Sequence, residues 1–545
     1  MPHRHRLLLE LDLTQPLIEP SADDPLERFF ARGRRLLRPT LRALHQAAGD
    51  ARVGGLIAKV GGPLPWTVVE ELRLGVAAFA KSGKPATAWA ESFVLGGAGM
   101  ASYVLASAFD EIWLQPGGEL SLPGVAVETT FLRGALDRLG VLPEFEQRHE
   151  YKNAPDQLLR TGYTDAHREA LTRLTGSVFE TAIDAIGDGR GMSPDRVREL
   201  VDAGPWTAPE ALRDGLVDRL GYRDEVYAAA RAAVGDGAVT LFADQWKPRR
   251  RIRPPARLRQ HVALVEARGA IGSGRSRRTP MGRSLGSDTV AAQLRAALRD
   301  EHARAVVLQV DSPGGSAVAS EVIWRELVRL REAGRTTVVS MGALAASGGY
   351  YIACPAEVIV ALPTTLTGSI GVFGGKLVVE QLLERAGITG GSVEHGAHAR
   401  MWSARRPFTA AERERLAASV DAIYADFVGK VAAGRRRDIG EIEPLARGRV
   451  WSGRDALRIG LVDELGGLRD AVRIARERAG LPDRAPVRPA LRVPPLARLG
   501  KPKNSDDPRA AATTLGAAVG DLASLGRTLG LPQGTELLMP GITIS

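Results

Sequence analysis

Residues 342–351 read Gly342-Ala343-Leu344-Ala345-Ala346-Ser347-Gly348-Gly349-Tyr350-Tyr351. This stretch places one serine among small residues, at the expected start of a helix. A nucleophile on a sharp turn from strand to helix needs backbone packed close behind it and an open face in front, and small neighbours allow both. The stretch therefore predicts a strand, a tight turn at Ser347 and a helix, with Ser347 as the candidate nucleophile.

A second turn precedes this one by about thirty residues, in Leu308-Gln309-Val310-Asp311-Ser312-Pro313-Gly314-Gly315. An apolar run breaks there into a Gly-Gly turn whose backbone N–H groups can point at a carbonyl oxygen. Taken alone, either turn is typical of an ordinary loop. Their occurrence in this order, followed by Thr365-Leu366-Thr367-Gly368-Ser369-Ile370-Gly371, favours a nucleophile with an oxyanion hole.

These segments resemble a known family, the serine-lysine signal peptide peptidases, also called protease IV, in their long form with two lobes. The matching segments are Asp311 to Gly315, Ser340 to Tyr351, Leu362 to Gly374 and Val450 to Gly467, with weaker similarity over most of residues 5–480. The resemblance implies an α/β fold of two tandem lobes similar to crotonases and the Clp protease, with parallel sheets and crossover helices. It also implies a serine nucleophile and a lysine general base.

The chain contains an internal duplication. Ala211 to Gly221 recurs as Ala456 to Gly466, an offset of 245 residues, and Tyr103 to Ser107 pairs with Tyr350 to Cys354. A repeat of this size predicts two similarly folded lobes, because a solenoid array would show a far shorter period. In this alignment Met100 stands where the second copy has Ser347, so the first lobe is expected to lack the nucleophile.

The alternation of apolar strands with helices predicts parallel pairing through right-handed crossovers. The expected opening strands are Leu7 to Leu13 and Val262 to Ile271, and long paired helices are expected at Thr164 to Gly187 and Thr409 to Gly434. The expected domains are an N-terminal lobe (1–245), a basic linker containing proline (246–260), a C-terminal lobe (261–483) and a linker with a tail of unassigned role (484–545).

The general base is expected in the first lobe. Glu150-Tyr151-Lys152-Asn153-Ala154-Pro155 resembles the block of the family that carries the catalytic lysine, although Asn153 replaces its small hydroxyl residue. The corresponding stretch of the second lobe, Ala397 to Met401, offers Arg400 instead, and arginine cannot lose its proton in a protein. The resemblance therefore implies Lys152 as the base for Ser347.

A Ser-Lys pair makes a specific demand on its surroundings. Lysine accepts the serine proton only when it is neutral, so its pKa must fall from about 10.4 toward about 7 or 8. Met100, Met401 and the alanines beside Ser347 are expected to supply apolar lining. The rival arrangement is Ser-His-Asp, for which the available histidines are His149, His395 and His398.

Composition narrows the class of protein. A chain of 545 residues is too long for one core, and 44% hydrophobic with 25% charged residues is typical of a globular protein. A net charge of +10 is compatible with binding to nucleic acid. The basic residues, however, are concentrated in two short runs, Lys247 to Arg259 and Arg275 to Arg283, so no nucleic-acid partner is expected. The single cysteine, Cys354, excludes an intramolecular disulfide and is expected in the core.

The N-terminus predicts neither a signal peptide nor a membrane span. Met1 to Pro20 carries Arg4 and Arg6 and then Glu10 inside its short apolar run, whereas long members of the family begin with a membrane anchor. We therefore expect a cytoplasmic protein, with peripheral contact to the inner face of the membrane as an added role. Leu26 to Ala48 is interpreted as a core helix, with an amphipathic helix at the membrane surface as the alternative.

The sequence thus predicts a serine endopeptidase that cuts peptides, such as signal-peptide remnants or unfolded segments, through an acyl-enzyme. Ser347 is the nucleophile, Lys152 the base, and Gly314 and Gly315 the oxyanion donors. No metal, nucleotide or other cofactor is expected, and the resemblance implies a homotetramer. Two alternatives stay open, a crotonase-like enzyme acting on acyl-CoA and a catalytically silent scaffold that binds peptides.

Overall fold

The computed structural model describes residues 6–19, 33–93, 99–235, 237–248, 260–279 and 282–491, with Ala31, Arg509 and two short strands near the C-terminus. The chain forms two compact units. Unit 1 comprises chiefly Met1–Ala126 and Thr175–Pro254, and unit 2 comprises Val127–Leu174 and Pro255–Thr543. The chain passes from unit 1 to unit 2 after Pro254, the third change of unit along the sequence, and the boundary expected near residue 245 is close to this point. Residues 127–174, however, leave the first unit and belong to the second.

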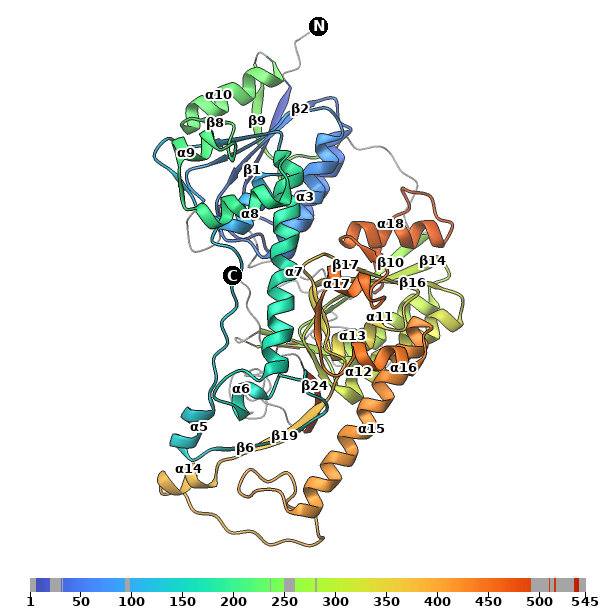
Figure 1. The fold of residues 1–545 in the computed structure, drawn as a ribbon. Coiled ribbons are helices and arrows are strands. Elements are labelled where there is room, and N and C mark those ends of the chain that lie inside the picture. Colours follow the sequence, from blue (N-terminus) through green and yellow to red (C-terminus); the bar gives the residue numbers. More distant parts are fainter. Residues whose placement is uncertain are drawn as a thin grey trace. The chain divides into compact units, whose positions relative to one another are not determined.

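The main sheet of unit 1 is parallel, in the spatial order β8-β4-β3-β2-β1-β9. Figure 1 labels β1, β2, β8 and β9 of this sheet. Its central strands are almost entirely buried, as expected for a parallel sheet covered by helices on both faces. Its strands are β1 (Leu7–Asp12), β2 (Val53–Val60), β3 (Ala86–Ala90), β4 (Glu111–Leu114), β8 (Arg219–Leu220) and β9 (Val239–Phe242).

Unit 2 repeats this sheet with the same order, β21-β17-β16-β14-β10-β22, again with parallel pairing. Its strands are β10 (His261–Arg268), β14 (Ala303–Ser312), β16 (Thr336–Ala346), β17 (Val358–Ala361), β21 (Glu464–Leu465) and β22 (Val487–Pro489). The matching strand orders confirm the α/β fold class and the predicted duplication.

Repeated side-chain contacts fix corresponding positions in the two sheets. The Tyr103 hydroxyl donates to the Leu216 carbonyl (2.6 Å), and the Tyr350 hydroxyl donates to the Leu461 carbonyl (2.8 Å). A short antiparallel pair recurs as well: β5 (Glu119–Leu120) with β7 (Trp206–Thr207) in unit 1, and β18 (Leu366–Gly368) with β20 (Val450–Ser452) in unit 2. These pairs flank the candidate site and its counterpart.

Unit 2 holds a further sheet that unit 1 does not repeat among its described residues, in the order β23-β12-β13-β11-β15-β24-β19-β6. Its strands are β23 (Thr514–Leu515), β12 (Arg277–Thr279), β13 (Gly282–Gly286), β11 (Ala270–Gly272), β15 (Gly314–Ser316), β24 (Gly534–Leu538), β19 (Phe373–Val378) and β6 (Leu142–Gln147). β6 comes from the first sequence repeat, and its antiparallel pairing with β19 explains why residues 127–174 belong to unit 2.

Helices connect the strands and cover the sheets. Those of the first repeat include α2 (Leu37–Ala48), α3 (Trp66–Ala80), α4 (Gly99–Ala106), α5 (Arg133–Leu139), α7 (Asp165–Arg190), α8 (Pro194–Ala203) and α10 (Arg223–Val234). Those of the second include α11 (Ser287–Arg299), α12 (Ala317–Glu332), α13 (Gly348–Ala353), α14 (Glu380–Arg385), α15 (Ala410–Arg435), α17 (Gly453–Arg458) and α18 (Leu468–Arg478). The expected long pair thus corresponds to α7 and α15.

The helix predicted over Leu26 to Ala48 is shorter in the structure. α2 begins at Leu37 and tolerates Pro39 because a proline in the first turn removes an N–H that has no partner within the helix. Its apolar face, which includes Leu37, Ala43 and Leu44, is buried in the unit 1 core. This supports the interpretation of residues 37–48 as a core helix. Residues 26–30 lie outside the described part.

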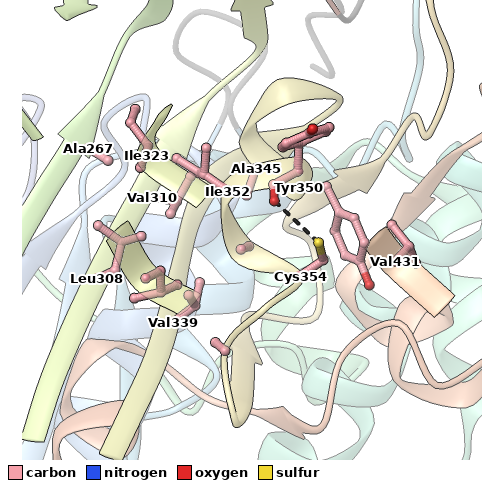
Figure 2. Packing of buried hydrophobic residues seen from close by; sticks show 14 of the residues in the cluster. Ala267, Leu308, Val310, Ile323, Val339, Ala345, Tyr350, Ile352, Cys354 and Val431 are labelled. Atoms are coloured by element: carbon pink, nitrogen blue, oxygen red, sulfur yellow. Dashed lines mark hydrogen bonds between the residues drawn. The ribbon is translucent and has the colours of Figure 1, made fainter. Parts of the chain in front are cut away.

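The unit 2 core is built around β14, β16 and α13. Leu308 and Val339 pack there with Ile352 and Cys354 (Figure 2). Cys354 is completely buried, its thiol donates to the Tyr351 carbonyl (3.2 Å), and burial raises its pKa to about 12. A thiol in this state is inert, so the prediction that Cys354 is a core residue is confirmed.

The helices in the described ranges all fall short of the length and apolar content that crossing a bilayer requires. Most of the predicted basic linker (249–259) and most of the tail beyond residue 491 lie outside the described residues.

Candidate active site

Ser347 stands between the end of β16 and the first turn of α13, as the sequence predicts. Its backbone has φ 55° and ψ −117°, a conformation that costs energy for a residue with a side chain. The surroundings hold it there: its N–H donates to the Gly368 carbonyl (2.8 Å), and a Cβ at Gly349 would lie 2.7 Å from the Ser312 carbonyl oxygen. The turn therefore requires the small neighbours that the sequence shows.

Lys152 lies against this serine. Its Nζ is 2.8 Å from Ser347 Oγ, 3.0 Å from Ser369 Oγ and 3.1 Å from the Ser369 carbonyl oxygen. Both Lys152 and Ser347 are completely buried. The two residues that the sequence singles out as base and nucleophile are therefore in direct contact within unit 2.

The lysine enters through the segment that contains β6 and the residues just after it, which we call the first arm (residues 141–154). β6 pairs with β19, and beyond it the Arg148 N–H donates to the Val372 carbonyl (3.0 Å). Gly448 makes the close approach possible, because a Cβ there would lie 2.5 Å from the Lys152 amide nitrogen. Glycine is also suited to its φ of +84°.

Side chains of the second repeat hold the first arm on either side of Lys152. The His149 ring packs on Tyr424 with centroids 4.6 Å apart, Arg447 pairs with the Glu150 carboxylate (2.9 Å), and Arg449 lies over the Tyr151 ring (4.9 Å). We call the surface formed by residues 369–372, Tyr424 and 447–449 the cradle. The cradle contacts the three residues that precede Lys152, and these contacts fix the position of the lysine.

Burial lowers the pKa of Lys152 well below its usual value of about 10.5. Removing an ammonium from water without a counter-charge favours the neutral amine. A neutral amine has one lone pair and two N–H donors. The three oxygen neighbours of Lys152 match this inventory.

Gly314 and Gly315 lie in β15, with φ of 101° and 148°. The Gly314 N–H donates to Ser312 Oγ (3.2 Å), so it is already engaged. Gly315 N lies 3.1 Å from the point where a Cβ of Gly348 would stand, which brings β15 directly behind the serine turn. Of the two predicted oxyanion donors, Gly314 thus has its N–H bonded to a side chain, whereas the nitrogen of Gly315 lies beside the serine turn.

The other candidates of the sequence lie in different settings. His149 packs on Tyr424 and is 3.5 Å from the Glu443 carboxylate, while His395 and His398 are exposed. Met100, the counterpart of Ser347, is buried in the unit 1 core. Arg400 lies 3.6 Å from the Glu394 carboxylate.

Two features of the site were missed from the sequence. Ser369 stands in a block that was recognised, but nothing in one sequence indicates that both its hydroxyl and its carbonyl face Lys152. The role of Gly448 was also missed. Arg447 and Gly448 both have left-handed backbone just after a short helical turn, but the sequence does not show that Lys152 lies against this position. Met401 was expected to line the lysine, but its carbonyl accepts a hydrogen bond from Lys376 instead. The backbone of Gly371 lies beside the lysine side chain, since a Cβ at Gly371 would be 3.1 Å from Lys152 Cδ.

The duplicated α/β units and a buried serine-lysine pair define a class of hydrolase, and comparison with known proteins identifies the family. The model of peptidase family S49 matches residues 78–235 and 329–482, one match in each sequence repeat. The chain belongs to this family, the serine peptidases of the protease IV and SPPA type.

Two curated relatives cover most of the chain. Protease 4 of Salmonella typhi is 34% identical over 460 residues, which cover 81% of this chain and 72% of that protein. The chloroplastic serine protease SPPA of Arabidopsis thaliana is 30% identical over 448 residues, which cover 80% of this chain and 65% of that protein.

Among solved structures, the chain is similar to an enoyl-CoA hydrotase/isomerase family protein from Silicibacter pomeroyi. The TM-score is 0.23 at 16% identity, covering 37% of this chain and 72% of that chain. The fold assignment rests on the sheet topology and the family match.

Proposed function

We propose that this chain is a serine endopeptidase in which Ser347 attacks the peptide carbonyl and Lys152 acts as general base. The observation that carries the proposal is the 2.8 Å contact between Lys152 Nζ and Ser347 Oγ in a fully buried setting. Distance and pKa direction both meet the requirement for a base, which must reach the proton and be able to accept it near neutral pH.

The hydrogen bonds of a neutral Lys152 account for its orientation. Its two N–H groups donate to the Ser369 carbonyl and to Ser369 Oγ, which leaves the lone pair directed at the Ser347 hydroxyl. Ser369 then serves as a positioning residue, because it turns the amine toward the nucleophile. The pair needs no third residue such as the aspartate of a Ser-His-Asp triad, because an amine has no tautomer to fix.

The reaction proceeds in two halves. Ser347 Oγ bonds to the carbonyl carbon as its proton passes to Lys152 Nζ, and the C–N bond breaks as the resulting ammonium returns that proton to the leaving amine. Water then attacks the acyl-enzyme, gives a proton to Lys152 and releases the peptide acid, and the proton returns to Ser347 Oγ.

In this proposal the oxyanion donors are backbone N–H groups, with Gly348 in place of the predicted Gly314, whose N–H donates to Ser312 Oγ. The N–H of Gly348, the residue after the nucleophile, stands at the start of α13, where helix N–H groups lack a partner within the helix. The Gly315 N–H from β15 is the second donor. Two such N–H groups stabilise the negative charge of a tetrahedral intermediate.

The position of β24 supports an extended peptide as substrate. This strand of the chain's own C-terminal region pairs antiparallel with β15 on one side, with Gly315 opposite Leu537, and antiparallel with β19 on the other, with Gly374 opposite Thr535. β15 and β19 are rich in glycine, so a backbone can approach closely. A slot beside the serine that takes an extended chain by ladder hydrogen bonds suits a peptide better than an acyl-CoA.

We further propose that the natural substrates are signal-peptide remnants or unfolded segments, cut in the cytoplasm or at the inner face of the membrane. Extended chains of this kind satisfy the ladder without first unfolding. Neither a cofactor nor a nucleic acid enters the reaction.

The test compares a fluorogenic peptide with an acyl-CoA as substrates for the full chain, and labels it with a fluorophosphonate. Peptide hydrolysis and labelling of Ser347, both abolished in Ser347→Ala, are the expected results. Turnover of the acyl-CoA without peptide hydrolysis, or a folded protein that fails to label, overturns the proposal.

A further inference from the structure

Arg449 stands where the two segments that hold the Lys152 amine meet. Its carbonyl accepts a hydrogen bond from the Ser369 N–H (2.7 Å). Ser369 supplies two of the three oxygens around Lys152 Nζ, and its backbone has φ 49°, a conformation that costs energy for a residue with a side chain. The backbone of Arg449 therefore helps to hold the acceptors of the amine in place.

The side chain of Arg449 turns to the first arm. Its guanidinium lies over the Tyr151 ring (4.9 Å), and its Nη1 is 2.8 Å from Glu169 Oε1. Glu169, on α7, accepts from the Tyr151 hydroxyl with its other oxygen (2.7 Å). These three side chains close a triangle, which we call the clamp (Tyr151, Glu169 and Arg449). Tyr151 immediately precedes Lys152, so the clamp acts on the residue next to the base.

One residue thus ties both sides of the amine. Lys152 Nζ must reach Ser347 Oγ and the two oxygens of Ser369 at the same time. A guanidinium suits this task, because its plane stacks on an aromatic ring while its edge donates to a carboxylate. Glu169 is 56% exposed, so its ion pair with Arg449 adds little to stability. The effect of the clamp is therefore expected on the position of the arm.

The first repeat lacks this arginine. Trp451 and Trp206 mark equivalent positions, because each indole N–H donates to the carbonyl six residues before it (2.9 and 3.1 Å). The residue two positions before the tryptophan is Arg449 in the second repeat and Gly204 in the first. Gly204 lines a pocket of about 550 Å³ in unit 1. The repeat that has Met100 in place of the serine thus also has no side chain at the position of the clamp arginine.

We propose that Arg449 is a positioning residue for the base. Its backbone fixes Ser369 and its side chain fixes Tyr151, so the amine of Lys152 is held toward Ser347 and away from water. The inference rests on the proposed function, because it assigns Arg449 to the reaction of the Ser347–Lys152 pair.

Arg449→Met in the full chain tests this role, since methionine is unbranched and flexible and carries neither the charge nor the plane of the guanidinium. With a fluorogenic peptide, kcat should fall about tenfold, less than the 10²-fold cost of a displacement of about 1 Å at a catalytic group. KM should stay unchanged, because the clamp holds the arm, whereas β15 and β19 form the proposed peptide slot.

The pH profile separates positioning from a purely structural role. Burial lowers the pKa of Lys152, so a loosened arm that admits water should raise this pKa toward 10.5. The amine is active only when neutral, and the acidic limb of kcat should therefore move to higher pH in Arg449→Met.

Two further variants on α7 keep the test specific. Arg173 also joins this helix to the second repeat, through a bidentate pair with Asp455 (2.6 and 2.8 Å), and it lies outside the clamp. Arg173→Met should therefore keep the kcat and the pH limb of wild type. Glu169→Ala, at an exposed position, should act like Arg449→Met but more weakly. The double variant should be no slower than Arg449→Met alone, because both changes act through Tyr151.

Lys152→Arg in the same assay distinguishes this inference from the proposed function. If Lys152→Arg is inactive while Arg449→Met keeps the kcat and the pH limb of wild type, the clamp has no positioning role and the dyad stands. Effects of Arg449→Met and Glu169→Ala that simply multiply, or an equal shift of the limb in Arg173→Met, also overturn the inference. A Lys152→Arg protein with wild-type activity overturns the inference and the proposed function together.

Discussion

The two repeats of this chain share a sheet order and differ at the point where chemistry is expected. In unit 2 a serine begins α13 and a buried lysine from the first arm touches it. In unit 1 Met100 stands at the position of the serine, and the corresponding cradle is an open pocket. Duplication thus supplied two scaffolds, and the contact between a serine and a buried lysine forms on one of them.

The contact between Lys152 and Ser347 therefore depends on the first arm as much as on the serine turn. The turn is local, because the small residues around Ser347 determine it. The lysine arrives from the other repeat, and its position depends on β6, β19 and the cradle. Variants of the serine, the lysine and the cradle separate these contributions.

Replacing the nucleophile is expected to have the largest effect. Ser347→Ala should lower kcat/KM by about 10⁴-fold or more, because the covalent route is lost. The matched change in the other repeat, Met100→Ser, should leave activity unchanged and add no second label. A doubly labelled Met100→Ser protein, measured by mass spectrometry, would show that unit 1 can complete a site of its own.

The base is expected to come next. Lys152→Arg and Lys152→Ala should both lower kcat/KM by about 10²- to 10⁴-fold, since neither side chain can accept the Ser347 proton. His149→Ala is the control because it lies in the same arm, and it should retain most of the activity. A dead His149→Ala beside an active Lys152→Arg, in the same peptide assay, would reassign the base to histidine.

A change in the cradle should act through the position of the lysine. Gly448→Ala puts a Cβ 2.5 Å from the Lys152 nitrogen, and a shift of about 1 Å at a catalytic group costs about 10²-fold in rate. Gly460→Ala is the control, because Gly460 also has positive φ (78°) but meets only a flexible arginine side chain. Both variants should lower Tm, and only Gly448→Ala should lower kcat/KM this far.

The smallest effect is expected at Ser369. Ser369→Ala removes one acceptor of the amine and keeps the carbonyl, so kcat/KM should fall about fivefold, or about 1 kcal/mol. The lost acceptor stabilises the ammonium more than the amine, so the Lys152 pKa should fall further. The acidic limb of the pH profile should therefore move to lower pH, and a limb that moves upward would contradict the role of Ser369.

The sequence predicted those parts of the molecule that local rules or repetition determine. The duplication, the parallel sheets and the turn at Ser347 follow from repeated segments and small residues, and the family match confirms the resemblance. The pairing of Lys152 with Ser347 was predicted by family resemblance, and the structure brings the two together.

Other parts depend on contacts between distant segments and could not be predicted. The sequence gives no sign that residues 127–174 leave the first unit, because β6 finds its partner in β19, more than two hundred residues away. The Ser312 hydroxyl that engages the Gly314 N–H, and the close approach of Gly448 to Lys152, likewise appear only when the chain is folded.

The role of Lys152 as the base for Ser347 determines how fast a fluorophosphonate modifies Ser347 at each pH, and this rate is measured in wild type and in Lys152→Arg. Burial lowers the pKa of Lys152, so the amine is charged and inactive below that pKa and neutral above it. The wild-type rate should therefore rise with pH through a pKa well below 10.5 and then level off. Lys152→Arg should be slow and flat over the same range. A Lys152→Arg protein that is modified at the wild-type rate, or that keeps the same pH limb, would contradict the Ser347–Lys152 dyad.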